Sequence, residues 1–104
     1  MARITRKIGI GRGRSFQVVI DDRFSDDFAR GLAQGNFWIR DEWRLLQSYL
    51  PDTGGRFLDL GGHLGSFALT AAAFGHDVVV VEASPTNAAL IQASVDVNHF
   101  ANVA

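Results

Sequence analysis

The stretch FLDLGGHLGS, residues 57–66, decides the fold that this sequence predicts. A short apolar run that contains Asp59 is followed by three glycines within five positions, Gly61, Gly62 and Gly65. Glycine has no Cβ atom, so it adopts positive φ at low cost and lets a ligand approach the backbone closely. The pattern therefore predicts a buried strand that turns sharply into a helix, with a ligand bound at the turn.

The segments that follow extend this strand and helix into an α/β unit. Apolar residues recur at helical spacing after the turn, and Gly75 supplies a C-terminal stop. VVVVE, residues 78–82, is a continuous β-branched run, typical of a strand covered on both faces. Ser84 and Pro85 then supply the N-cap and the first residue of another helix. The order strand, helix, strand, helix predicts two parallel strands joined by a right-handed crossover.

The first half of the chain predicts smaller elements. Two β-branched segments, residues 2–10 and 15–20, are joined by glycines and predict a β-hairpin with a basic turn rather than a phosphate loop. Four aspartates in residues 21–27 predict a solvated turn and helix start rather than a metal site, and residues 30–36 a weakly structured link. Residues 37–50 have the spacing of a helix with one apolar face, whose tryptophans we expect to be packing residues.

Composition limits the class of protein. A chain of 104 residues with 47% hydrophobic and 20% charged residues is typical of one globular domain. The formal net charge of −1 gives no strong attraction to nucleic acid or to anionic membranes, and we expect neither as a partner. The absence of cysteine excludes disulfides and thiolate chemistry and suits a reducing compartment. No apolar run reaches the roughly 18 residues of a membrane helix, so we expect a cytoplasmic protein.

Acidic residues at the ends of the two predicted parallel strands indicate the ligand. Asp59 precedes the glycine turn, where it would repel a pyrophosphate but suits the ammonium group of an amino acid. The turn amides at the helix N-terminus suit a carboxylate. Glu82 ends the next strand, and its two oxygens can accept hydrogen bonds from both hydroxyls of a ribose. S-adenosylmethionine combines these three groups and is the cofactor we expect; in the alternative, Asp59 caps the loop and Glu82 is a surface carboxylate.

Three motifs carry a family resemblance. The first is Asp59, Gly61, Gly65 and Phe67; the second is Glu82 and Pro85; the third is Asn98 with Asn102 and Val103. Together they resemble the FkbM family of S-adenosylmethionine-dependent methyltransferases, with its D-x-G-A-N-x-G and E-P-x-P motifs and a later "NV". The chain departs from that pattern at Gly62, His63 and Ala83, where the family usually has alanine, asparagine and proline. We expect the glycine to be a mild change, and the histidine to offer a ring N–H in the direction of the asparagine it replaces.

The resemblance covers roughly residues 38–104 and implies a partial Rossmann-like class I methyltransferase fold, in which methyl transfer goes to a hydroxyl of a small molecule or sugar. The residue pattern predicts a hairpin and linker over residues 1–36, and the resemblance implies the first half of the cofactor-binding α/β domain over residues 37–104. The implied cofactor-binding residues are Asp59, Gly61, Gly62, His63, Gly65, Ser66, Phe67, Glu82, Ala83 and Ser84. No catalytic residue and no metal site is assigned.

A complete fold of this kind needs further strands and helices, so we expect a truncated chain without the acceptor pocket and general base, and with doubtful activity on its own. Two other classes of function stay open. One is a non-catalytic module that binds a partner, or a second copy, through the exposed edge of an incomplete sheet. The other is a fragment of a nicotinamide-dependent oxidoreductase that uses the same acidic residue for ribose.

Overall fold

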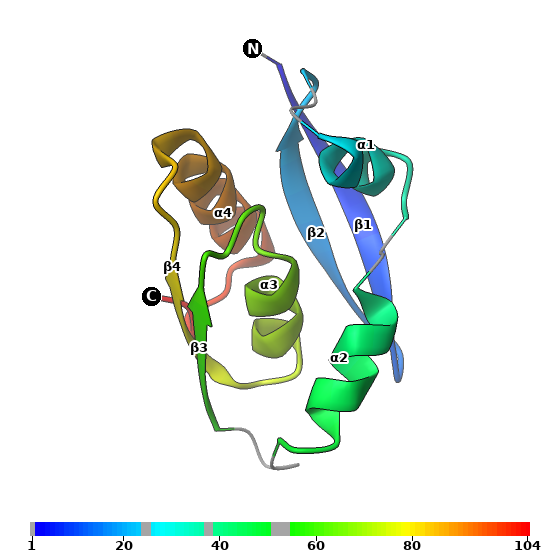
Figure 1. Cartoon of the computed structure of the whole chain (residues 1–104), viewed down its shortest axis with the longest axis vertical. Coiled ribbons are helices and arrows are strands. Elements are labelled where there is room, and N and C mark those ends of the chain that lie inside the picture. The colour runs from blue at the N-terminus through cyan, green and yellow to red at the C-terminus, as the bar shows by residue number, and fades with distance from the viewer. Residues whose placement is uncertain (1, 24–25, 37–38, 51–54) are drawn as a thin grey trace.

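A computed structural model describes residues 2–23, 26–36, 39–50 and 55–104. The described chain has four strands and four helices (Figure 1): β1 (Arg3–Gly11), β2 (Arg14–Asp21), α1 (Asp27–Ala33), α2 (Arg40–Gln47), β3 (Arg56–Leu60), α3 (Ser66–Ala73), β4 (Asp77–Val81) and α4 (Pro85–Asn98). The strands form two sheets, an antiparallel hairpin of β1 with β2 and a parallel pair of β3 with β4. The predicted hairpin and the predicted β-α-β-α order are confirmed, and the fold is a small α/β one.

Helices α3 and α4 lie between the two sheets (Figure 1). The hairpin turns one face toward these helices, because alternate residues of a strand point to the same side. Side chains from the hairpin and both helices share one core, which includes Ile8, Phe16, Val18, Ile20, Leu69, Leu90 and Ile91. Full burial of a large aliphatic or aromatic side chain contributes about 1.5–3 kcal/mol. The hairpin is therefore an integral layer of the fold.

Side chains of α4 bond the outer edge of β2. The N–H of Val19 donates to Ser94 Oγ at 2.9 Å, and that buried hydroxyl donates to the carbonyl of Leu90. The N–H of Gln17 donates to Asn98 Oδ1 at 2.8 Å, and Asn98 Nδ2 donates back to the Gln17 carbonyl at 2.6 Å. Residues four apart lie on one face of a helix, so α4 supplies partners for alternate residues of β2.

Two of the N-terminal arginines bond the ends of helices. Arg6 Nε donates to the carbonyl of Ala33 at 2.8 Å, and Arg14 Nη1 donates to the carbonyl of Ala73 at 2.8 Å. The Arg14 guanidinium also lies 5.3 Å from the ring centroid of Phe74. Carbonyls in the last turn of a helix lack intrahelical donors and carry partial negative charge, which cations stabilise. Arg6 and Arg14 therefore stabilise the C-terminal ends of α1 and α3.

Helix α1 corrects one prediction. Residues 30–33, expected to belong to a weakly structured link, are its second half, and Leu32 is buried against the hairpin. The helix begins where a turn and helix start were predicted, because Asp26 Oδ1 accepts the N–H of Ala29 at 2.7 Å. An aspartate N-cap stabilises a helix by about 1 kcal/mol, which offsets the cost of Gly31 within it.

Helix α2 confirms part of the prediction for residues 37–50. Trp43 is buried, stacked on Phe74 at a centroid distance of 5.8 Å and tilted against Phe57 at 6.1 Å. It is a packing residue, as expected; Trp38 and the stop at Pro51 lie outside the described residues. The helix is amphipathic, as predicted, but its apolar side is only partly covered, because Leu45 is 65% exposed and Tyr49, just after the helix, is 81% exposed. The predicted helix therefore forms, and of its side chains the neighbouring elements bury Trp43.

The outer face of the parallel pair is exposed, which corrects a second prediction. Its apolar side chains are Leu58, Leu60, Val79 and Val81, all large and all exposed. Helices α3 and α4 cover the other face, where Val78 is buried. The β-branched run at residues 78–82 is thus covered on one face only, although its sequence is typical of a strand covered on both.

The last residues lie beside β4. Val103 forms a parallel bridge with Val78, and the N–H groups of Val78 and Val80 donate to the carbonyls of Asn102 and Ala104. Asn102 Nδ2 also donates to the carbonyl of Ala72 in the last turn of α3 and to that of His76 in the loop after it, which ties this segment to the helix. This parallel bridge lies on the opposite side of β4 from β3. In the described part of the chain, no helix combines the length and apolar character needed to cross a bilayer.

Candidate site at the carboxyl ends of the parallel strands

Two loops meet at the carboxyl ends of β3 and β4. The β3–α3 loop (residues 61–65) folds over β4, because the N–H groups of Gly61 and Gly62 both donate to the carbonyl of Val81, at 2.8 and 3.1 Å. Gly61 has φ +77° and Gly65, which precedes α3, has φ +88°. These two positions require glycine, because a side chain is strained at such φ values.

Glu82 links the β3–α3 loop to the β4–α4 loop (residues 82–84). Its Oε1 accepts the N–H of His63 and its Oε2 accepts the N–H of Ser84, each at 2.7 Å. These two backbone donors lower the pKa of the Glu82 carboxyl, with Ser84 the larger cause. A carboxylate offers about four acceptor positions, so about two remain for a ligand. Glu82 is therefore both a structural bridge and a candidate binding group.

The expectation that the turn amides hold a ligand carboxylate is wrong for most of the loop. The N–H groups of Gly61, Gly62, His63 and Gly65 all donate within the chain, Gly65 to the carbonyl of Gly62 at 2.8 Å. These amides close the loop and fix its shape before any ligand arrives.

Asp59 lies on the helix-covered side of β3, under the start of α3. Its Oδ2 is buried and has no hydrogen-bond donor among the described residues. Burial raises the pKa of the Asp59 carboxyl, the charge of Glu82 raises it further, and the N–H of Ala68 opposes both. A buried carboxylate oxygen without a donor is costly. A cationic ligand group that reached Asp59 would offset this cost.

Gly62 is fixed by packing rather than by its backbone angles. A Cβ atom built on Gly62 would lie 2.4 Å from Val80 Cγ2 and 3.7 Å from Asp59 Oδ2. The expectation of a mild departure from the FkbM pattern is therefore wrong for this structure. Alanine at this position requires a shift of the branched, rotationally restricted valine.

The ring of His63 contacts helix α1. Its Nε2 lies 3.0 Å from Asp26 Oδ2, and the ring packs edge-on against Phe28 with centroids 5.6 Å apart. His63 has φ +54°, a left-handed conformation that asparagine adopts more readily than most residues. Asp26 and Phe28 were missed as neighbours of the site, since no local signal links residues so far apart in sequence.

The remaining predicted residues divide between the site and the core. Ser84 is at the site and caps α4, because its Oγ accepts the N–H of Asn87 at 3.3 Å. Ala83 is exposed in the same loop. Ser66 is buried, and its Oγ has no partner among the described residues. Phe67 is half-buried and packs against the cluster around Trp43.

A cavity of about 350 Å³ lies beside Glu82. Besides Glu82 and Gln92, its lining is apolar and comes from β4, α4 and the last residues, including Val81, Ile91 and Val95. This volume lies within the roughly 300–1,000 Å³ of small-molecule pockets, and apolar walls with one carboxylate at the mouth suit a nucleoside. In the ranges that the structure describes, no three His, Asp or Glu side chains gather as ligands for a metal ion.

No protein-family model matches the chain, and no curated protein is significantly similar to it. The function is therefore inferred from the residues themselves.

Proposed function

We propose that this chain binds S-adenosylmethionine at the carboxyl ends of β3 and β4, as the first half of a Rossmann-like class I methyltransferase. The observation that carries the proposal is the position of Glu82. Its carboxylate is held across two loops by backbone amides, keeps about two acceptor positions and borders an apolar cavity. A ribose whose hydroxyls bind that carboxylate would direct its base toward the cavity.

Two further observations support the proposal. The buried Oδ2 of Asp59 has no donor among the described residues, and the ammonium of the cofactor is a suitable partner. The strand arrangement also suits a Rossmann-like sheet, because β3 and β4 are parallel and Val103 forms a parallel bridge with Val78 on the other side of β4.

The chemistry divides between the cofactor and the protein. The cofactor, when bound, supplies a methyl group on a positively charged sulfur. The residues of this chain bind and orient it, which lowers the entropic part of the barrier to methyl transfer. We propose a hydroxyl of a small molecule or sugar as the acceptor, following the FkbM resemblance, and a cytoplasmic location, following the absence of cysteine.

The test is calorimetric titration with S-adenosylhomocysteine, adenosine and NAD. We expect S-adenosylhomocysteine to bind more tightly than NAD. Glu82→Gln should weaken both S-adenosylhomocysteine and adenosine by about 1–3 kcal/mol, roughly 5- to 150-fold, because it removes the charged acceptor of the ribose hydroxyls. Tighter binding of NAD, or no binding of either nucleoside, would contradict the proposal.

A matched control separates binding from folding. Asp77→Asn removes an exposed carboxylate from the opposite end of β4 and should leave both nucleoside affinities unchanged. Because Glu82 also joins the two loops, circular dichroism must show that Glu82→Gln is folded. Equal losses for the two substitutions would assign the effect to overall charge rather than to a ribose contact.

A further inference from the structure

A cavity of about 400 Å³ lies between the turn of the hairpin and helix α2. Figure 1 shows α2 beside the end of the hairpin where β1 turns into β2. The walls of the cavity come from the end of β1, the turn, one side of α2 and Phe74, which follows α3. Three of the lining residues are arginines, Arg12, Arg40 and Arg44, and none of the described residues that line it is acidic.

The sequence of α2 places its positive charges on the side that lines the cavity. Arg40, Trp43, Arg44 and Gln47 are spaced i, i+3, i+4 and i+7, so they share one side of the helix. Asp41 lies on another side, with its Oδ1 3.5 Å from Arg44 Nη1, and the two side chains are 91% and 73% exposed. An ion pair this exposed contributes little to stability, so Arg44 is able to exchange it for a ligand.

Arg12 has a backbone conformation that favours other residues. Arg12 and Gly13 form the two-residue turn between β1 and β2, and their φ values are +53° and +70°. Turns with two positive φ values favour asparagine followed by glycine, because most other side chains are strained at the first position. In the part of the chain that the structure describes, the exposed Arg12 side chain has no hydrogen-bond or ion-pair partner. A strained arginine whose charge makes no contact within the fold indicates a functional position.

Two residues of α2 give the cavity a fixed shape. Arg40 Nη2 donates to the carbonyl of Gly9 at 2.9 Å, which orients the guanidinium against the hairpin. Trp43 is buried, and its Nε1–H has no acceptor among the described residues. A buried N–H group without an acceptor is costly, and an anion that reached this group would offset the cost.

We propose that this cavity binds the phosphate group of a small phosphorylated molecule, with Arg12, Arg40 and Arg44 as the binding residues. Guanidinium groups bind phosphate oxygens through paired N–H donors. Three such groups from two elements suit a multiply charged, tetrahedral anion better than a carboxylate, which has one charge and two oxygens. The volume is that of a small-molecule pocket, whereas a formal net charge of −1 gives no extended basic surface for a nucleic acid.

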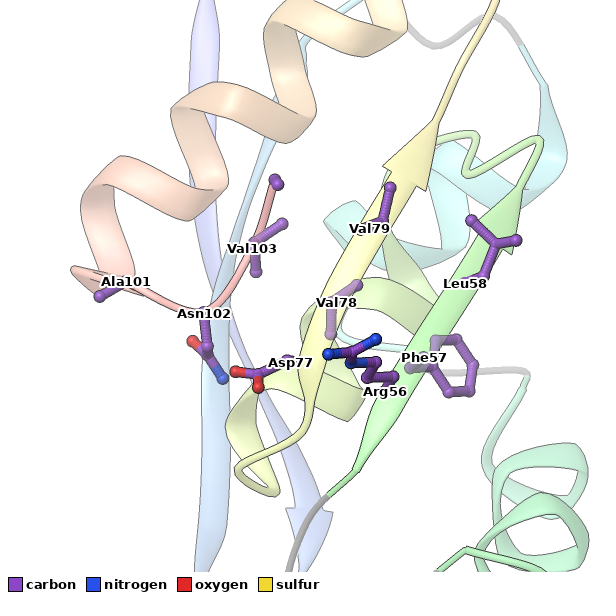
Figure 2. A pocket seen from close by; sticks show the side chains of 10 residues that line it. Arg56, Phe57, Leu58, Asp77, Val78, Val79, Ala101, Asn102 and Val103 are labelled. Atoms are coloured by element: carbon purple, nitrogen blue, oxygen red, sulfur yellow. The ribbon is translucent and has the colours of Figure 1, made fainter.

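This phosphate site is separate from the proposed cofactor site. Phe74 lies shortly before the amino end of β4, whereas Glu82 follows its carboxyl end. Figure 2 looks onto the outer face of β3 and β4, and the hairpin lies behind the sheet and its helices. Rossmann-like sheets carry helices on both faces, so we expect further elements on that outer face rather than over the cavity. The proposal therefore does not depend on S-adenosylmethionine binding.

Calorimetric titration with inorganic pyrophosphate at constant ionic strength tests the proposal. We expect a dissociation constant below about 1 mM, at least about tenfold tighter than that of acetate. Heteronuclear NMR should show shifts for the Trp43 indole N–H and the Arg12 and Gly13 amides, but not for the amides of His63 and Ser84. No binding at about 10 mM pyrophosphate, or shifts confined to residues 61–65 and 82–84, would overturn the proposal. Tighter binding of an oligonucleotide than of pyrophosphate would overturn the assignment to a small molecule.

Arg12→Asn separates binding from stability. Asparagine suits the first position of the turn, so this variant should raise the midpoint of thermal unfolding and yet weaken pyrophosphate binding at least about tenfold. Arg44→Gln should weaken binding at least about fivefold. Asp41→Asn should tighten binding about two- to fivefold, because it removes the carboxylate that competes for Arg44. Wild-type affinity in Arg12→Asn would overturn the proposal.

Arg3→Gln is the matched control, because it removes the same charge from the far end of β1. It should change the affinity for pyrophosphate by less than about twofold, since salt screens charges at that separation. Equal losses in Arg3→Gln and Arg44→Gln would assign binding to overall charge and overturn the site.

Discussion

Replacing Gly62 with alanine tests the packing of the site directly. The new Cβ atom would lie 2.4 Å from Val80 Cγ2, closer than carbon atoms approach. Overpacking of this kind costs about 1–3 kcal/mol. The lower entropy of the unfolded chain with alanine returns about 0.4–1 kcal/mol, since Gly62 lies outside the positive-φ region. We therefore expect a net loss of about 1.3 kcal/mol in the free energy of unfolding, within a range of about 0–2.6 kcal/mol.

In a Val80→Ala background, Gly62→Ala should change the free energy of unfolding in the opposite direction. Val80→Ala alone removes half-buried methyl groups and costs about 1–2 kcal/mol, but it also removes the atom that Gly62→Ala would meet. In that background Gly62→Ala should be neutral or stabilising by up to about 1 kcal/mol. Urea unfolding of the four proteins, monitored by circular dichroism, gives the coupling free energy between the two sites.

Gly61→Ala is the control for backbone effects. A Cβ on Gly61 meets nothing within 4 Å, but its φ of +77° is strained for any side chain. Gly61→Ala should lower the free energy of unfolding by about 1–2 kcal/mol, equally with valine or alanine at position 80. An equal change in the free energy of unfolding on Gly62→Ala in both backgrounds would refute the packing argument.

Three further substitutions test the site and its supports. Asp59→Asn should raise the free energy of unfolding at pH 7, because the folded state raises the pKa of the Asp59 carboxyl and so disfavours its ionised form. Its advantage over the wild type should shrink as the pH falls through the raised pKa toward the ordinary value of 3.8, and an advantage that is constant with pH would contradict the burial of the charge. Ser94→Ala should cost about 1–3 kcal/mol in urea unfolding, because it leaves the N–H of Val19 without its acceptor; an unchanged midpoint would mean that water replaces the hydroxyl. His63→Gly should stabilise the chain by up to about 1 kcal/mol, because relief of the positive φ outweighs the loss of a partly exposed contact with Asp26, and a lower midpoint of thermal unfolding would contradict this.

The β3-α3-β4-α4 unit was predictable because its signals are local. Glycines mark the turn after Asp59, a β-branched run marks β4, and Ser84 with Pro85 marks the start of α4. Each signal depends on the conformational preferences of a few neighbouring residues. The hairpin was predictable for the same reason.

Helix α1 was missed because its stability comes from the rest of the fold. A helix of seven residues with a glycine inside it has little intrinsic stability, and Leu32 is held by burial against the hairpin. The exposure of Leu45 and of the outer face was missed for a related reason. Apolar periodicity predicts which side chains could be covered, but it does not show whether a neighbour covers them.

At the candidate site, the sequence predicted which residues form the two loops, but not the hydrogen bonds between the loops. Glu82 was predicted from its place at the end of a strand, and the structure adds that its two oxygens already accept the N–H groups of His63 and Ser84. Such bonds depend on how close the two loops lie in space. The availability of the Gly61 and Gly62 amides was overestimated for the same reason, because their acceptor, the carbonyl of Val81, belongs to another strand.

The bonds from α4 to the edge of β2 also limit how this chain can aggregate. A strand recruits another chain through N–H and C=O groups that point outward without partners. On β2, Ser94 and Asn98 already hold such groups at alternate residues, so a strand added there would first have to displace a helix. The hairpin edge that could still pair with another chain is therefore that of β1. Exposed charged side chains there, such as Arg3 and Lys7, make such pairing unfavourable.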